Sequence, residues 1–100
     1  MRFVSTRNKK YGVSLSQAIY QGLAMDGGLF VPEYLPSINW KSFSENLSYS
    51  QFAEKVLQPF FADDKLLNHL PEICKQTFSF RMPTLELQAN TFMLELFHDR

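Results

Sequence analysis

The first run of apolar residues with helical spacing follows Ser14. Its apolar positions fall at i, i+3, i+4, i+7 and i+8 and share one face: Leu15, Ala18, Ile19, Gly22 and Leu23. Ser14 and Gln17 have the spacing of a capping box, in which each side chain bonds the other residue's backbone N–H. Gly27 and Gly28 predict the end of this helix, because glycine readily takes the left-handed conformation of a C-cap. Gly22, on the apolar face, indicates that another backbone approaches closely.

Two later runs also predict helices. Ser48 and Gln51 repeat the capping-box spacing, and the strongest apolar stripe of the chain follows them: Tyr49, Phe52, Ala53, Val56, Leu57 and Phe60. Pro59 lacks a backbone donor, so this helix should kink or end there. The other run extends from Asp64 to about Phe78, and Pro71 should divide it into two pieces. Its apolar side consists of Leu66, Leu70, Ile73, Cys74 and Phe78. A short helix is also expected around residues 40–46.

The period of the pattern changes to two near the end of the chain. Residues 84–87 and 92–97 alternate, and Ala89-Asn90 supplies a turn between them, which predicts a β-hairpin. Residues 29–31 are expected to be extended, and residues 3–5 should pair at the hairpin's edge. The fold class is therefore α+β. It comprises a small, mostly antiparallel sheet, made of the N-terminal strand and the C-terminal hairpin, packed with three to four helices in one domain over residues 1–100.

Composition narrows the class of protein. Ten Lys and Arg balance ten Asp and Glu without a basic cluster, and counterion release from nucleic acid needs several clustered cations. No apolar run approaches the roughly 20 residues that span a bilayer, and the N-terminus turns polar too early for a signal peptide. A single cysteine excludes an internal disulfide and an all-cysteine metal site. We therefore expect a cytoplasmic protein that binds neither nucleic acid nor membrane.

Few residues indicate chemistry. His69 and His98 lack the spacing of metal ligands, Cys74 lies on an apolar helix side, and Asp63-Asp64 should serve a helix N-terminus. Asp26-Gly27-Gly28 is either a helix end before a strand or a place where backbone closely approaches a ligand or another domain. The strand that ends at His98 is either an ordinary edge strand or one that delivers a catalytic group. From the residues alone, the active site is incomplete.

Three motifs, in this order, resemble those of threonine synthase N-terminal domains. They are Ser5-Thr6-Arg7, the run from Ala18 through Gly22-Leu23-Ala24 to Asp26-Gly27-Gly28-Leu29-Phe30-Val31-Pro32, and Leu94-Glu95-Leu96-Phe97-His98. The third is similar to the start of the family motif Glu-Leu-Phe-His-Gly-Pro-Thr-x-Ala-Phe-Lys-Asp. Asp99-Arg100 stand here where the family has Gly-Pro.

The resemblance implies a pyridoxal-phosphate enzyme of the tryptophan-synthase-β-like fold group, which converts O-phospho-L-homoserine to L-threonine and phosphate. The lysine of the family's Phe-Lys-Asp forms the Schiff base with pyridoxal phosphate, and it would lie beyond Arg100. We therefore expect this chain to bind no cofactor, to be inactive alone and to dock on the cofactor-binding domains of the same chain. Its docking surface would be the apolar second strand of the hairpin, through Phe97. Asp26, Gly27, Gly28 and His98 are expected near the active site, and the alternative is a free-standing protein-interaction module.

Overall fold

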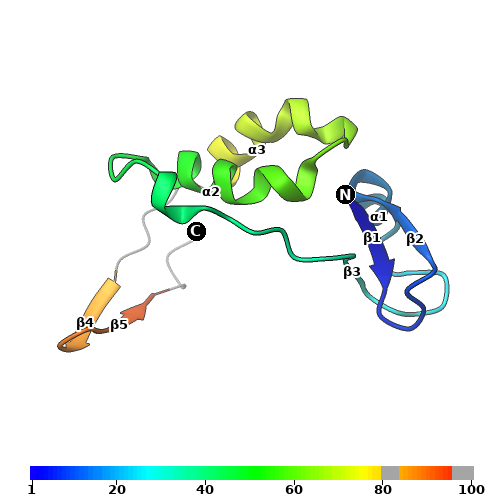
Figure 1. Ribbon diagram of the computed structural model, residues 1–100, viewed down its shortest axis with the longest axis horizontal. Coiled ribbons are helices and arrows are strands. Elements are labelled where there is room, and N and C mark those ends of the chain that lie inside the picture. The colour runs from blue at the N-terminus through cyan, green and yellow to red at the C-terminus, as the bar shows by residue number, and fades with distance from the viewer. Residues whose placement is uncertain (80–83, 96–100) are drawn as a thin grey trace.

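A three-stranded antiparallel sheet forms the N-terminal end of the computed structural model, which describes residues 1–79 and 84–95. β1 (Arg2–Ser5) lies between β2 (Gly12–Ser14) and β3 (Phe30–Pro32), as Figure 1 shows. Val4 is opposite Gly12 on one side and Val31 on the other. The prediction that residues 3–5 pair with the hairpin is wrong. Strands nearer in sequence occupy both edges of β1, and shorter loops cost less closure entropy.

Helix α1 (Leu15–Gln21) is shorter than the sequence predicts. Ser14 Oγ accepts from the Gln17 N–H at 3.2 Å, but the Gln17 side chain bonds Gln21 instead of returning to Ser14. The helix ends at Gly22, whose φ is 79°, and not at Gly27-Gly28. A Cβ on Gly22 would have no heavy atom within 4 Å. Gly22 therefore provides a left-handed helix end, and the close backbone approach predicted for it is wrong.

The helical part of the chain agrees with the pattern. α2 (Tyr49–Leu57) begins with the predicted capping box of Ser48 and Gln51 and ends before Pro59. A 3-10 turn follows at Gln58–Phe61, and another, Lys65–His69, precedes α3 (Leu70–Thr77). Pro71 lies in the first turn of α3, so the predicted division occurs there. The helix expected at 40–46 is only a 3-10 turn, Trp40–Ser42.

The core joins the sheet to the helices. It contains one residue from β1, two from α1, one each from α2 and the turn after it, and two from α3: Phe3, Leu15, Ala18, Ala53, Phe61, Leu70 and Cys74. Asp64 strengthens the junction, because its Oδ1 accepts from the Ser16 N–H at 3.0 Å and its Oδ2 from the Leu66 N–H at 2.9 Å. This carboxylate therefore caps the 3-10 turn at Lys65–His69 and also ties it to α1.

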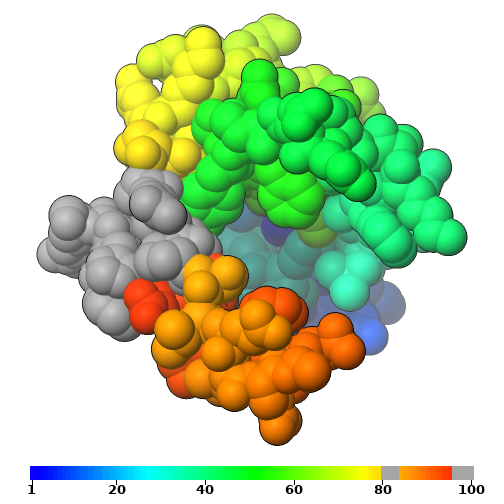
Figure 2. All heavy atoms as spheres, turned by 90° about the vertical axis from the view of Figure 1, so that its left-hand side faces the viewer, coloured from blue at the N-terminus to red at the C-terminus, as the bar shows by residue number. Residues whose placement is uncertain are grey.

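The C-terminal hairpin stands apart from this core. β4 (Thr84–Gln88) pairs with β5 (Thr91–Leu94), and the predicted turn contains Asn90 at a φ of 61°. Every residue of both strands is exposed, and Figure 2 shows the orange hairpin separated by a hollow from the green helical region. The α+β class is confirmed, with two small sheets instead of one. The helices expected to pack on a sheet that contains the hairpin do not cover the hairpin: α2 packs on α3, and α1 lies against β1 and β2.

Candidate functional site

The first two sequence motifs meet at the end of β1. The Ser5 hydroxyl donates to the Asp26 carboxylate, with Oγ 2.7 Å from Oδ1 and 2.9 Å from Oδ2. Its oxygen also accepts from the Arg7 N–H at 3.1 Å. Ser5 is fully buried, so its donor and acceptor are both used inside the protein. This satisfies the requirement that buried polar groups find partners.

Further hydrogen bonds close the loop before β3 onto β1. Asp26 Oδ1 accepts from the Gly28 N–H at 2.9 Å, and Arg7 Nη1 donates to the Asp26 carbonyl at 3.0 Å. Thr6 Oγ1 accepts from the Leu29 N–H at 3.0 Å, and the Thr6 N–H donates to the Leu29 carbonyl at 2.9 Å. We call residues 5–7 and 26–28 the clamp.

Both glycines of the clamp are required by its geometry. Gly27 has a φ of 83°, which other residues rarely adopt. A Cβ on Gly28 would overlap the Ser5 hydroxyl oxygen and lie 3.0 Å from both Asp26 Oδ1 and Thr6 Oγ1. The close approach at Gly28 is therefore made by side chains of the same chain. The prediction that these glycines end a helix is wrong, because they lie in a loop that is held against β1.

Hydrogen bonds and a nearby positive charge favour the ionised form of the Asp26 carboxyl. The hydrogen bond from Ser5 lowers its pKa below the ordinary 3.8, the Gly28 N–H and the Arg7 charge add to this effect, and desolvation opposes it. Asp26 is therefore ionised at neutral pH and only accepts hydrogen bonds. General acid–base work at neutral pH needs a carboxyl pKa shifted upward, so the carboxylate fits a structural role.

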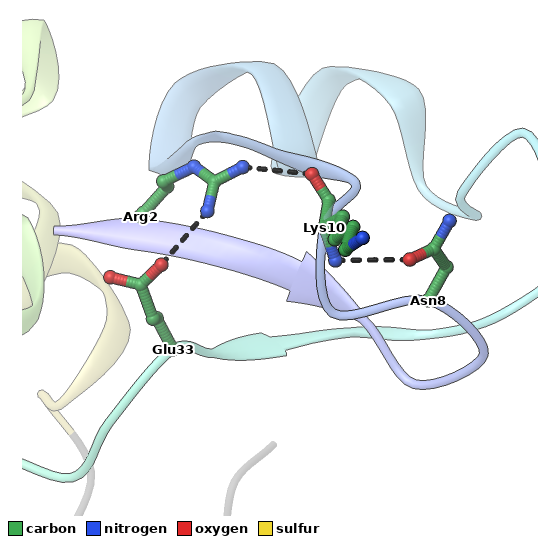
Figure 3. A network of polar contacts seen from close by, with 4 residues as sticks. All are labelled: Arg2, Asn8, Lys10 and Glu33. Atoms are coloured by element: carbon green, nitrogen blue, oxygen red, sulfur yellow. Dashed lines mark hydrogen bonds and ion pairs between the residues drawn. The ribbon is translucent and has the colours of Figure 1, made fainter.

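A cavity of about 390 Å³ lies beside the clamp, against residues of β1 and β3. It is lined by Val4, Ser5, Thr6, Lys9, Val31, Pro32 and Glu33. In the adjoining network of Figure 3, Arg2 bonds Glu33 Oε2 at 2.9 Å and the Lys10 carbonyl at 3.0 Å. Asn8 Oδ1 accepts from the Lys10 N–H at 3.0 Å. The Ser5 hydroxyl in this lining is buried and already donates its hydrogen bond to Asp26.

The other candidate residues are not brought to the clamp. His69 is exposed, and Cys74 is completely buried in the core, where burial raises its thiol pKa and the Glu54 charge adds to the rise. His98 lies outside the described residues, as do Leu96 and Phe97. Within 1–79 and 84–95, no three His, Cys, Asp or Glu side chains are grouped to hold a metal ion. No helix in the described part of the chain is long and apolar enough to cross a membrane.

Sequence reasoning identified both halves of the clamp but not their pairing. The sequence did contain a signal for this pairing: a serine ends one strand, and Asp-Gly-Gly precedes the strand next to it. Antiparallel pairing of those strands brings the two segments together. The fold and the clamp define a small α+β domain whose first two sequence motifs fix a loop in place and, among the described residues, do not assemble reactive groups.

Comparisons with known proteins identify the family. The family described as Threonine synthase N terminus matches residues 2–78. Threonine synthase of Pseudomonas aeruginosa is 32% identical over 98% of this chain and 22% of its own length, and that of Haemophilus influenzae is 31% identical over 98% and 23%. The crystal structure of threonine synthase from Escherichia coli matches with a TM-score of 0.83 at 30% identity, covering 98% of this chain and 23% of that chain. The chain belongs to the threonine synthase N-terminal family and spans about a quarter of the length of these relatives.

Proposed function

We propose that this chain forms the N-terminal domain of a cytoplasmic, pyridoxal-phosphate-dependent threonine synthase. That enzyme, a carbon–oxygen lyase acting on phosphate, would convert O-phospho-L-homoserine to L-threonine and phosphate in threonine biosynthesis. The observation that carries the proposal is the similarity of 98% of this chain to about a quarter of several threonine synthases. In such an enzyme the cofactor supplies an electron sink.

The residues of this chain do not fit the cofactor. A Schiff-base lysine is activated in a desolvated pocket or beside another cation. The six lysines here are all exposed: Lys9, Lys10, Lys41, Lys55, Lys65 and Lys75. We therefore assign pyridoxal phosphate to the remaining part of the full-length protein. The 100-residue chain is expected to bind none and to be inactive by itself.

The hairpin supports docking on the cofactor-binding domains of the same chain. A two-stranded hairpin is only marginally stable alone in water, yet both faces of this one carry exposed apolar side chains: Leu85, Leu87, Phe92, Met93 and Leu94. The radius of gyration is 16.2 Å, larger than the roughly 13 Å of a compact domain of this length. An elongated domain with an uncovered hairpin is consistent with one that packs on a larger body.

The same proposal places Asp26, Gly27, Gly28 and His98 near the active site of the whole enzyme. For the first three residues, the supporting observation is that the clamp holds an exposed loop in one conformation. Their role would be to position backbone and not to react, because the Asp26 carboxylate is already bonded to Ser5 and Gly28.

A chimera tests the proposal. The corresponding N-terminal segment of Escherichia coli threonine synthase would be deleted, or replaced by this chain, and phosphate release from O-phospho-L-homoserine would be measured. We expect the deletion to abolish turnover and the replacement to restore it, with the intact enzyme as control. A replacement that folds and binds cofactor but releases no more phosphate than the deletion would contradict the proposal and favour a free-standing interaction module.

A further inference from the structure

A second apolar surface lies at the other end of the molecule from the hairpin (Figure 1). It consists of residues from the end of α1 and the loop that follows: Ile19, Tyr20, Leu23, Met25 and Leu29. Their exposed fractions run from 57% for Leu23 to 88% for Tyr20. We call these five residues the α1 face.

The backbone places two residues of this face, Leu23 and Leu29, side by side. Gly22 ends α1, so Leu23 leaves the helix and forms an isolated antiparallel bridge with Leu29. Residues opposite each other in such a bridge have adjacent side chains. Ala24 is buried, and its two exposed neighbours in the chain are Leu23 and Met25. The clamp holds the next residues, 26–28, and so fixes the position of this loop.

The α1 face also lacks charge. No charged residue occurs between Lys10 and Asp26, although the solvent-facing side of a surface helix ordinarily carries charged and polar groups. The core of a protein interface is depleted in charged residues and enriched in aromatic residues and methionine, with a polar rim. Tyr20 and Met25 match that core, while exposed Arg7 and Asp26 adjoin the loop as a polar rim.

We infer that the α1 face is an intramolecular docking surface for the remaining part of the threonine synthase chain, separate from the hairpin. This inference rests on the proposed function. The threonine synthases that match this chain carry about three quarters of their length outside it. A body tethered to the domain is present at an effective concentration in the millimolar range, which favours it over a second copy. Fixing the loop beforehand lowers the entropy lost on docking.

Chemical modification of tyrosine tests the inference. The 100-residue chain and the full-length protein would be treated with tetranitromethane, and nitration would be followed by peptide mass spectrometry. We expect Tyr20 to react readily in the 100-residue chain and at least about tenfold more slowly in the full-length protein, where tenfold corresponds to about 1.4 kcal/mol. Tyr34, 59% exposed and next to the ion-paired Glu33, is the matched control and should react alike in both.

Substitution provides a second measurement. Tyr20→Lys should leave the melting temperature of the 100-residue chain unchanged and lower that of the full-length protein, whereas Tyr34→Lys should leave both unchanged. Equal nitration of Tyr20 in the two proteins, or equal protection of Tyr20 and Tyr34, would overturn the inference. So would self-association of the 100-residue chain that Tyr20→Lys abolishes, because the partner would then be a second copy. Phosphate release by the wild-type full-length protein tests the proposed function separately: Tyr20 protected without turnover would leave the surface standing and the enzyme assignment wrong.

Discussion

Gly28→Ala is the most direct test of the clamp. The added methyl group would overlap the Ser5 hydroxyl oxygen and press on Asp26 Oδ1 and Thr6 Oγ1 at 3.0 Å. None of these atoms can move freely, because each takes part in the hydrogen bonds between β1 and the loop before β3. Relief of the overlap therefore requires the loop to move away from β1 and the Ser5–Asp26 bonds to lengthen or break.

The expected magnitude follows from two contributions. Overpacking a well-packed site costs roughly 1–3 kcal/mol, and a buried hydroxyl left without its partner costs about 1–3 kcal/mol. Moving the loop relieves part of the overpacking while it breaks the hydrogen bonds, so the two costs overlap in part, and we expect a total loss of about 2–4 kcal/mol, less than their full sum. For a domain of this size each kcal/mol lowers the melting temperature by about 4–8 °C. The variant should therefore melt at least about 8 °C lower than the wild type.

Thermal and urea unfolding followed by circular dichroism would measure this loss. Gly27→Ala is the matched control, because its added group meets only the end of the flexible Arg7 side chain at 3.2 Å and the left-handed backbone should cost about 1–2 kcal/mol. Ser5→Ala removes the overlapping oxygen, so Ser5→Ala/Gly28→Ala should be less destabilised than the sum of the two single variants. A Gly28→Ala loss under about 0.5 kcal/mol, or strict additivity in the double variant, would refute the clamp as described.

Three further predictions concern stability and reactivity. Asp64→Ala removes one carboxylate that accepts from both the Ser16 and Leu66 N–H groups, so it should lower the unfolding free energy by about 1–2 kcal/mol in urea titrations. Burial opposes ionisation of Asp64, but these bonds outweigh it and hold its pKa below 3.8. The stability that ionised Asp64 contributes is therefore fully present above the pKa of Asp64 in the unfolded chain and is lost as pH falls through its lower pKa in the folded chain. When the pH is lowered below about 4, Asp64→Ala should therefore lose less stability than the wild type. Cys74, fully buried with a raised thiol pKa, should react with a disulfide reagent only after urea unfolds the chain, and rapid labelling of the native protein would contradict its place in the core. Arg2→Ala removes an exposed ion pair to Glu33 and should change stability by less than about 1 kcal/mol in the same titrations; a larger loss would show that its bond to the Lys10 carbonyl also matters.

Local signals explain which helices the sequence predicted well. The start of α2 depends on Ser48 and Gln51 and its end on Pro59, and all three act within one turn of their own position. Pro71 acts equally locally where α3 begins. α1 differs because two sites offered glycine for its end. The apolar spacing continued beyond Gly22, so the pattern favoured the later pair, whereas the backbone used the first.

Pairing between segments distant in sequence was harder to predict. The hairpin at 84–94 has both strands next to its own turn, and its register follows from that turn. β1 had several possible partners, and the choice of β2 and β3 depends on loop closure and on the Ser5–Asp26 contact across 21 residues. Periodicity carries no information about such a contact. The two motifs can be recognised separately in the sequence, but only the folded chain shows that they bond each other.

The places where apolar spacing failed to predict burial are informative about function. Leu15 and Ala18 of α1 are buried as expected, but Ile19 and Leu23 on the same predicted face are exposed. The hairpin, predicted as a surface for helices, is exposed along both strands. A prediction of burial from apolar spacing assumes that the chain covers its own apolar residues. The prediction fails where another domain or protein covers them instead. Places where local sequence and structure disagree are expected to be functional or strained sites. Here the disagreements fall on the two surfaces that we propose for docking, at opposite ends of an elongated domain, which is the arrangement expected if one large body contacts it at both ends.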